Sequence, residues 1–381
     1  MIYFDNSATT QIFPEASDAM TQTMATYFAN PSSLHRLGNQ AHDLLTAARQ
    51  QVAGTLGAKT NEIFFTSGGS ESNNWAIKGT AHEKAARGKH LITSSVEHPS
   101  VAHTFQRLES EGFEVTYLPV DAEGRVNPED VRKAIRPETT LVSVMAVNNE
   151  IGTIQPIEAI ARILDDYPTI HFHVDGVQSV GKLPVPLIDS RVDLMNFSAH
   201  KFNGPRGVGI LYKKANRRIT PLIEGGGQEM GQRSTTENLA GIVATAKALR
   251  LTMDHSGQEM VTHEAIQQKI RACLAQYPDT VRVFSPEIGA SPHVLCFAVK
   301  GVRGEVMVHA LEDEDIYVST TSACSSRQTD VESSTLSAMK VDSRWAQNAV
   351  RLSFGYQNTL EEADIFLTVL TTLLHKFSKI Q

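Results

Sequence analysis

The stretch Ile170-His-Phe-His-Val-Asp-Gly-Val-Gln178 is a short run of apolar and β-branched residues that stops at an aspartate and a glycine. Six similar runs occur along the chain, separated by stretches with the apolar period of a helix, such as 71–87, 101–111 and 157–166. Nearly continuous apolar strands that alternate with helices are typical of a mostly parallel sheet covered on both faces. The sequence therefore predicts an α/β fold with seven strands, at 63–66, 90–94, 114–118, 141–147, 170–174, 194–197 and 209–212.

The pattern changes after about residue 241. A long helical stretch at 242–274 is followed by alternating segments at 294–299 and 316–319 and by a closing helix at 360–377. These features predict a second, smaller α+β domain. We place the large domain at 13–255 and the small domain at 1–12 and 256–381; the opening strand 2–4 could pack with either half.

Composition limits the classes of function. The chain has 381 residues and a formal charge of −7, which does not favour binding to nucleic acid or to anionic lipid. Three cysteines cannot form a disulfide framework in a chain of this length, so a reducing compartment is expected. No signal peptide or run of about 18 apolar residues is visible. We expect a soluble, cytoplasmic protein with no membrane partner.

The first polar cluster that follows a predicted strand is Phe64-Phe-Thr-Ser-Gly-Gly-Ser-Glu-Ser-Asn-Asn74. Gly68 and Gly69 permit a tight turn, and Ser70 with the free N–H groups of the next helical turn could hold a phosphate. A plain helix cap at Ser70 explains the same residues equally well.

Two further clusters follow strands. Asp175 comes directly after the run 170–174, where its carboxylate could pair with a protonated ring nitrogen or merely cap a helix. Lys201 ends the sequence Ser198-Ala-His-Lys201 and is followed by Gly-Pro-Arg-Gly. Most lysines are exposed charges, but the carboxyl ends of parallel strands share one edge of a sheet, where ligands bind. A lysine at that edge is a candidate for Schiff-base chemistry.

The order of these clusters resembles that of fold-type I pyridoxal enzymes, and the whole chain resembles the cysteine desulfurases of the class V aminotransferase superfamily. The matching stretches are Asp5-Asn-Ser-Ala-Thr-Thr10, Asn30-Pro-Ser-Ser33, 66–74, Glu97-His-Pro99, Val147-Asn-Asn-Glu-Ile-Gly152, 173–182, 198–207, 233–238, Ser322-Ala-Cys-Ser-Ser326 and Val350-Arg-Leu-Ser-Phe-Gly355.

The resemblance implies that the protein binds pyridoxal 5'-phosphate. Lys201 would hold the cofactor as a Schiff base and later move a proton. Asp175 would pair with the pyridine nitrogen, and Gln178 would hydrogen-bond the phenolic oxygen. His98 would stack on the ring and act as an acid or base, although a structural histidine is the ordinary alternative.

The resemblance also implies the contacts of the phosphate and the substrate. Thr236 would contact the cofactor phosphate bound to a partner subunit, which implies a homodimer. The residue before Thr236 is usually glycine in the family and is Thr235 here. Arg351 would bind the carboxylate of the substrate L-cysteine. Asn149 would lie beside this carboxylate and contact the cofactor as well. The alternative for Arg351 is a surface ion pair. The remaining phosphate ligands would be Gly69, Ser70, Ser198 and His200. No metal site is predicted.

Cys324 decides which reaction is expected. Cys273 and Cys296 have apolar neighbours and fit the usual role of buried cysteine, whereas Cys324 lies among serines in the polar stretch 319–334 with Arg327 close by. In the resembled family this cysteine takes sulfur from the substrate as a persulfide and releases alanine, and the acceptor of the sulfur would be a tRNA thiolase or an iron–sulfur scaffold. The alternatives are a selenocysteine lyase, another class V lyase or aminotransferase, and a sulfur carrier or scaffold without turnover.

Overall fold

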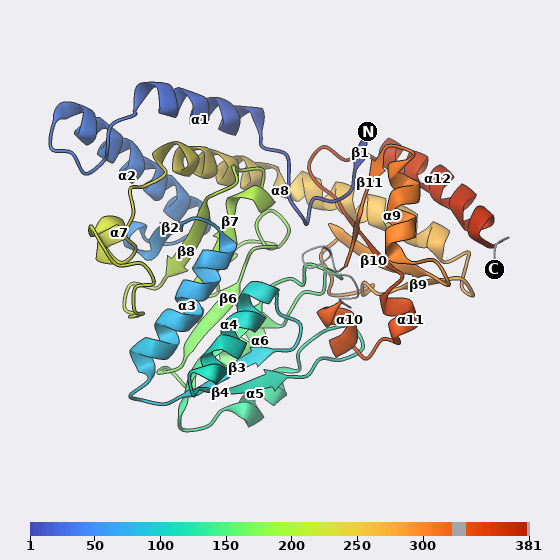
Figure 1. Ribbon diagram of the computed structural model, residues 1–381, viewed down its shortest axis with the longest axis horizontal. Helices are drawn as coiled ribbons and strands as arrows, with labels where there is room; N and C mark the ends of the chain where they lie inside the picture. The colour runs from blue at the N-terminus through green and yellow to red at the C-terminus, as the bar shows by residue number, and fades with distance from the viewer. Residues whose placement is uncertain (322–332, 379–381) are drawn as a thin grey trace.

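The computed structural model describes residues 1–321 and 333–378 (Figure 1). The strands are β1 (Ile2–Tyr3), β2 (Ile63–Thr66), β3 (His90–Ser94), β4 (Glu114–Leu118), β5 (Thr139–Met145), β6 (His171–Asp175), β7 (Leu194–Ser198), β8 (Gly209–Lys213), β9 (Val281–Val283), β10 (Val294–Val299), β11 (Ile316–Tyr317), β12 (Ser319–Thr320) and β13 (Ala349–Ser353). The helices are α1 (Pro14–Thr26), α2 (Arg36–Leu56), α3 (Gly69–Lys84), α4 (Pro99–Ser110), α5 (Pro128–Ala134), α6 (Ile157–Leu164), α7 (Gln228–Gly231), α8 (Leu239–Leu274), α9 (Gly304–Glu312), α10 (Ser334–Ala338), α11 (Ser343–Ala346) and α12 (Leu360–Ser378).

The predicted large sheet is confirmed. It has seven strands in the order β2-β8-β7-β6-β5-β3-β4, and only β8 runs antiparallel to its neighbours. β2, β3 and β4 occupy the predicted residues, and the other four strands start or end within two residues of the predicted bounds. The carboxyl ends of the six parallel strands therefore share one edge, as the ligand-binding rule for such sheets requires.

Helices cover both faces of this sheet because successive residues of a strand point to opposite sides. Leu91 of β3 packs with α3 and α4, where Phe105 is fully buried. Its neighbour Ile92 joins the core on the other face, with Leu45 of α2 and Leu249 of α8. Burial on both faces explains why the strands are almost continuously apolar.

The second unit is built on a smaller sheet. Its four strands are antiparallel in the order β12-β13-β10-β9, and its own apolar core includes α9, α12 and the end of α8. The opening strand β1 pairs in parallel with β11, and Asp5 bridges to Ser353 of β13, so the N-terminus packs with this second half. α8 continues unbroken across residue 255, so the predicted boundary there lies inside a helix and stays a prediction (Figure 1).

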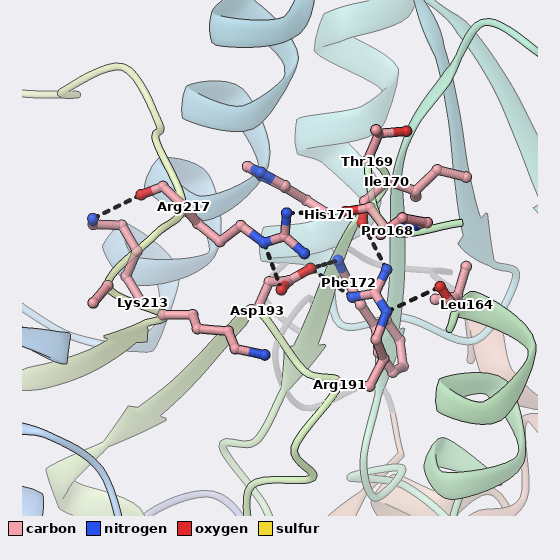
Figure 2. A network of polar contacts seen from close by, with 12 residues as sticks. Leu164, Pro168, Thr169, Ile170, His171, Phe172, Arg191, Asp193, Lys213 and Arg217 are labelled. Atoms are coloured by element: carbon pink, nitrogen blue, oxygen red, sulfur yellow. Dashed lines mark hydrogen bonds and ion pairs between the residues drawn. The ribbon is translucent and has the colours of Figure 1, made fainter. Parts of the chain in front are cut away.

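A buried charge network ties β6 and β7 together at their amino ends, on the edge of the sheet opposite the carboxyl ends (Figure 2). The carboxylate of Asp193 is fully buried and accepts hydrogen bonds from the guanidinium groups of Arg191 and Arg217, each at 2.7 Å, and from the backbone N–H of Phe172 at 2.9 Å. Arg191 also donates to backbone carbonyls of Leu164, Tyr167 and Ile170.

No helix in the described part of the chain is long and apolar enough to cross a membrane.

We expect Asp193→Ala to lower the free energy of unfolding by about 3–5 kcal/mol, because it leaves two poorly exposed guanidinium groups without their counter-charge. Glu158→Ala is the matched control: it removes an ion pair with Arg162 on the exposed face of α6 and should cost less than about 1 kcal/mol. Urea unfolding followed by circular dichroism measures both. Equal losses in the two variants would contradict a structural role for the Asp193 network.

Candidate active site

A cavity of about 540 Å³ opens at the carboxyl edge of the large sheet, between the two units. Its lining comes from the segments that follow β2, β3, β5, β6 and β7, from the N-terminal loop and from β13. Ten of the residues predicted for the site line it: Gly69, Ser70, His98, Asn149, Asp175, Gln178, Ser198, His200, Lys201 and Arg351.

Two predicted site residues are not placed in this cavity. Thr236 is exposed and is not among the lining residues. Cys324 lies outside the described residues. The roles predicted for both therefore stay predictions. Cys296 is fully buried in the core, as expected, and Cys273 is half-buried on α8.

The Asp175 carboxylate is held by three donors. Oδ1 accepts from the backbone N–H of Val177 at 3.0 Å and from Asn196 Nδ2 at 3.2 Å, and Oδ2 accepts from Asn73 Nδ2 at 2.9 Å. The bond from Val177 is the one expected of a helix cap, but the two amide donors come from other elements. They stabilise the carboxylate and fix its orientation at the cavity wall.

The Lys201 amine lies against the N-terminal loop. Nζ donates to the backbone oxygens of Ser7, at 2.5 Å, and Ala8, at 2.9 Å. Ser7, Ala8 and Thr9 all line the cavity, so the first ten residues are part of the site. The only signal of this in the sequence is the matching stretch 5–10, which assigns no role to individual residues.

Gln178 is oriented by a buried lysine that the sequence analysis did not single out. Lys182 Nζ donates to Gln178 Oε1 at 3.1 Å and to the backbone oxygen of Lys201 at 3.2 Å. The Ser7 carbonyl can only accept, so Gln178 Nε2 donates to it and the Gln178 oxygen faces Lys182. Burial, and then repulsion from Lys201, lower the pKa of Lys182 to about 7.

One end of the cavity is suited to an anion. It includes the first turn of α3, where Gly69 and Ser70 present backbone N–H groups near the Ser198 hydroxyl. A Cβ at Gly69 would come within 2.8 Å of Val177 Cγ2 and 3.4 Å of Ser198 Cβ, so a larger residue here would have to displace the Val177 side chain. His200 also lines the cavity, with Nδ1 3.2 Å from Thr9 Oγ1, and burial together with the charge of Lys201 lowers its pKa to about 4.

Arg351 is not a surface ion pair. Its side chain is 3% exposed, its Nη2 donates to Asp5 Oδ1 at 2.9 Å, and its Nη1 donates to the backbone oxygen of Asn149 at 3.0 Å. Within the described part of the chain its buried Nε has no hydrogen-bond partner. Arg351 thus retains donor capacity beyond the contacts with Asp5 and Asn149.

Comparison with known proteins identifies the family to which this chain belongs. The model of the class-V aminotransferase family matches residues 2–366. The chain belongs to the class-V aminotransferase family. It is 59% identical to a NifS/IcsS protein homolog of Lactobacillus delbrueckii subsp. bulgaricus, over 100% of this chain and 99% of that protein.

Two further comparisons cover nearly the full length of this chain and of the compared protein. A cysteine desulfurase IscS of Clostridium botulinum is 43% identical over 98% of this chain and 94% of its own length. The solved structure of a NifS-like protein superposes with a TM-score of 0.92 at 38% identity and full coverage of both chains. The predicted resemblance and fold are confirmed.

We expect the buried Lys182 to make the stability of this class-V protein depend on pH. Its pKa is about 7 in the folded protein and about 10.4 in an unfolded chain, so between these values the unfolded chain binds one more proton. The free energy of unfolding should therefore rise with pH, by about 1.4 kcal/mol per pH unit from this residue. Lys182→Met removes this contribution.

The stability of wild type minus that of Lys182→Met should thus increase between about pH 7.5 and 9.5 in urea titrations. Lys376→Met on α12 is the control, since an exposed lysine is hydrated in both states. Parallel stability curves for wild type and Lys182→Met would show that Lys182 keeps its charge in the folded protein.

Proposed function

We propose that the protein is a pyridoxal 5'-phosphate-dependent cysteine desulfurase. The observation that carries the proposal is that one cavity brings together the Lys201 amine, the Asp175 carboxylate and the Arg351 guanidinium. The names of the relatives support this reaction, since the IscS relative from Clostridium botulinum is a cysteine desulfurase.

The residues present fit the cofactor. Lys201 would hold its aldehyde carbon covalently, and the Asp175 carboxylate would accept from its pyridine nitrogen. Its phosphate would lie against Gly69, Ser70, Ser198 and His200, where backbone N–H groups and a glycine without steric room for a side chain form a cradle. When bound, pyridoxal phosphate supplies an electron sink that weakens the bonds at the substrate Cα and Cβ.

The substrate would enter with its carboxylate toward Arg351. The guanidinium is already oriented by Asp5 and Asn149, so a carboxylate can be bound without reorganising the side chain. The negative charge of Asp5 offsets part of the attraction for a second carboxylate, which eases the release of alanine. Lys201 would move the proton at the substrate Cα.

Sulfur would leave through Cys324. Its thiolate attacks the sulfur of the substrate cysteine, the Cβ–S bond breaks, and the electron pair on carbon is protonated to give alanine. One cysteine and one protein thiol thus yield one alanine and one persulfide, with no added oxidant or reductant. The persulfide would then pass to a tRNA thiolase or an iron–sulfur scaffold in the cytoplasm.

A homodimer would complete the site. Thr236 is exposed on its own subunit, and the preceding Arg233 anchors the loop to Glu71 of α3 through two hydrogen bonds of 2.6 and 2.8 Å. Phe28 (75% exposed), Leu34 (96%) and Met230 (51%) leave apolar surface at the same end of the molecule, around the α1–α2 loop and α7 (Figure 1). Exposed apolar side chains at one end of a molecule favour a protein partner there.

To test the reaction, Cys324→Ser should bind the cofactor but neither release alanine nor form a persulfide, because a hydroxyl is a much poorer nucleophile than a thiolate at neutral pH. After one turnover of wild type with L-cysteine, mass spectrometry should find about 32 Da (one sulfur atom) on the Cys324 peptide. Cys273→Ser, which removes the half-buried thiol of α8, should behave as wild type. Alanine release by Cys324→Ser at the wild-type rate would exclude the desulfurase mechanism.

To test the dimer, sedimentation equilibrium at micromolar concentration should give twice the mass of the 41.7 kDa chain. Leu34→Glu should raise the dimer dissociation constant at least tenfold, because it places a charge on the apolar surface. Ile288→Glu, at a site 83% exposed in the second unit, is the matched control and should leave the dimer intact. A fully active monomer would contradict the shared site, and an unaffected Leu34→Glu dimer would contradict the surface proposed for it.

A further inference from the structure

We propose that His98 faces the cavity as a neutral imidazole with its proton on Nε2, and that Ser100 and Asn73 are positioning residues that hold it in this tautomer. The hydrogen bonds that lead to this conclusion connect His98 to Asp175 through three elements: α4, α3 and β6.

The first step concerns His98 Nδ1. His98 is the N-cap of α4, and its Nδ1 accepts from the backbone N–H of Ser100 at 3.2 Å. A backbone amide nitrogen can only donate, so a hydrogen on Nδ1 would point at another hydrogen. The neutral ring must therefore carry its hydrogen on Nε2.

The second step fixes the Asn73 amide. Asn73 Nδ2 lies 2.9 Å from Asp175 Oδ2 and 2.9 Å from Ser100 Oγ. The reversed amide would place two oxygens 2.9 Å apart at Asp175, which is repulsive. Both hydrogens of Nδ2 are therefore committed, one to the carboxylate and one to the Ser100 hydroxyl oxygen.

The third step fixes the hydroxyl. Since Ser100 Oγ accepts from Asn73, its own hydrogen is available for His98 Nδ1, which lies 2.8 Å away. Every hydrogen in the chain from Asp175 to His98 then has one assignment, while Asn73 Oδ1 is buried without a partner among the described residues. Nδ1 receives two donors, and a second proton on the ring would have to displace both.

The charges around His98 agree with a neutral ring. Burial is the largest effect and lowers its pKa; Lys201, after β7, and His103, on α4, lower it further, while Asp175 opposes them. His98 lines the cavity, and among the described residues nothing accepts a hydrogen bond from its Nε2. The donor on Nε2 is therefore left for a ligand.

The consequence for chemistry deepens the proposed function and, in this part, rests on it. A neutral ring with a hydrogen on Nε2 can donate a hydrogen bond to an oxygen or sulfur acceptor of the bound substrate or cofactor. It cannot accept a proton at that nitrogen. Proton transfer within the cavity then falls to other groups, first of all Lys201, and the role of His98 changes from acid–base catalyst to hydrogen-bond donor.

The tautomer can be measured without turnover. In protein labelled with ¹⁵N-histidine, long-range ¹⁵N–¹H spectra distinguish a protonated ring nitrogen from a bare one. The signals of His98 are those lost in His98→Gln. We expect Nε2 protonated and Nδ1 bare at pH 7, both with and without added pyridoxal phosphate, and a midpoint for the second proton below the value near pH 6.5 of an unperturbed histidine.

Ser100→Ala tests the positioning role. It removes one of the two donors to Nδ1, so the pH at which His98 gains a second proton should rise by about 0.5–1 unit, as expected for the loss of one net hydrogen bond. Ser100→Thr keeps the hydroxyl and should restore the wild-type midpoint. Ser110→Ala, at the exposed end of the same helix, is the control and should have no effect.

Two results would overturn the proposal. One is a hydrogen on Nδ1, or a His98 already doubly protonated near pH 7. The other is a Ser100→Ala variant with an unchanged midpoint, which would remove Ser100 from the positioning role. Neither result depends on whether the protein releases sulfur from cysteine, so a failed desulfurase assay leaves the measured tautomer standing.

Discussion

The carboxylate of Asp175, at the carboxyl end of β6, is the group on which the organisation of the site depends. A negative charge at the wall of a cavity needs donors, and they come from Val177, Asn196 and Asn73 on three neighbouring segments. Asn196 and Asn73 thereby link β7 and α3 to the end of β6. Through Asn73 the carboxylate also reaches Ser100 and His98 on α4, so one charge orders groups on both sides of the cavity.

The N-terminal loop gives a second constraint on the same edge of the sheet. Its carbonyl oxygens at Ser7 and Ala8 accept from Lys201, while Asp5 pairs with Arg351 of the smaller sheet. A segment of a few residues therefore contacts functional groups from both units. The position of Arg351 relative to Lys201 is therefore set by contacts near the start of the chain, more than 190 residues from Lys201.

The sequence predicted the large sheet well because, apart from the edge strand β4, its strands are buried along their whole length and are rich in apolar and β-branched residues. α2 was not predicted, since small residues (Gly38, Ala41, Ala48 and Ala53) fill half of its buried positions and weaken the apolar period. Asp175 and Lys201 could be placed at one edge from strand order alone, but their individual roles came from the family resemblance. Lys182 and Asn73 could not be found in this way, because only the folded chain shows that their side chains contact Gln178 and Asp175.

α8 has a consequence for engineering. At 36 residues it is a continuous rod of about 54 Å that supplies apolar side chains to the cores of both units. Chimeras that join the first half of one relative to the second half of another at residue 255 would cut this rod in the middle. Crossovers placed at either end of α8 would instead keep the helix whole, and with it the distance between the two walls of the cavity.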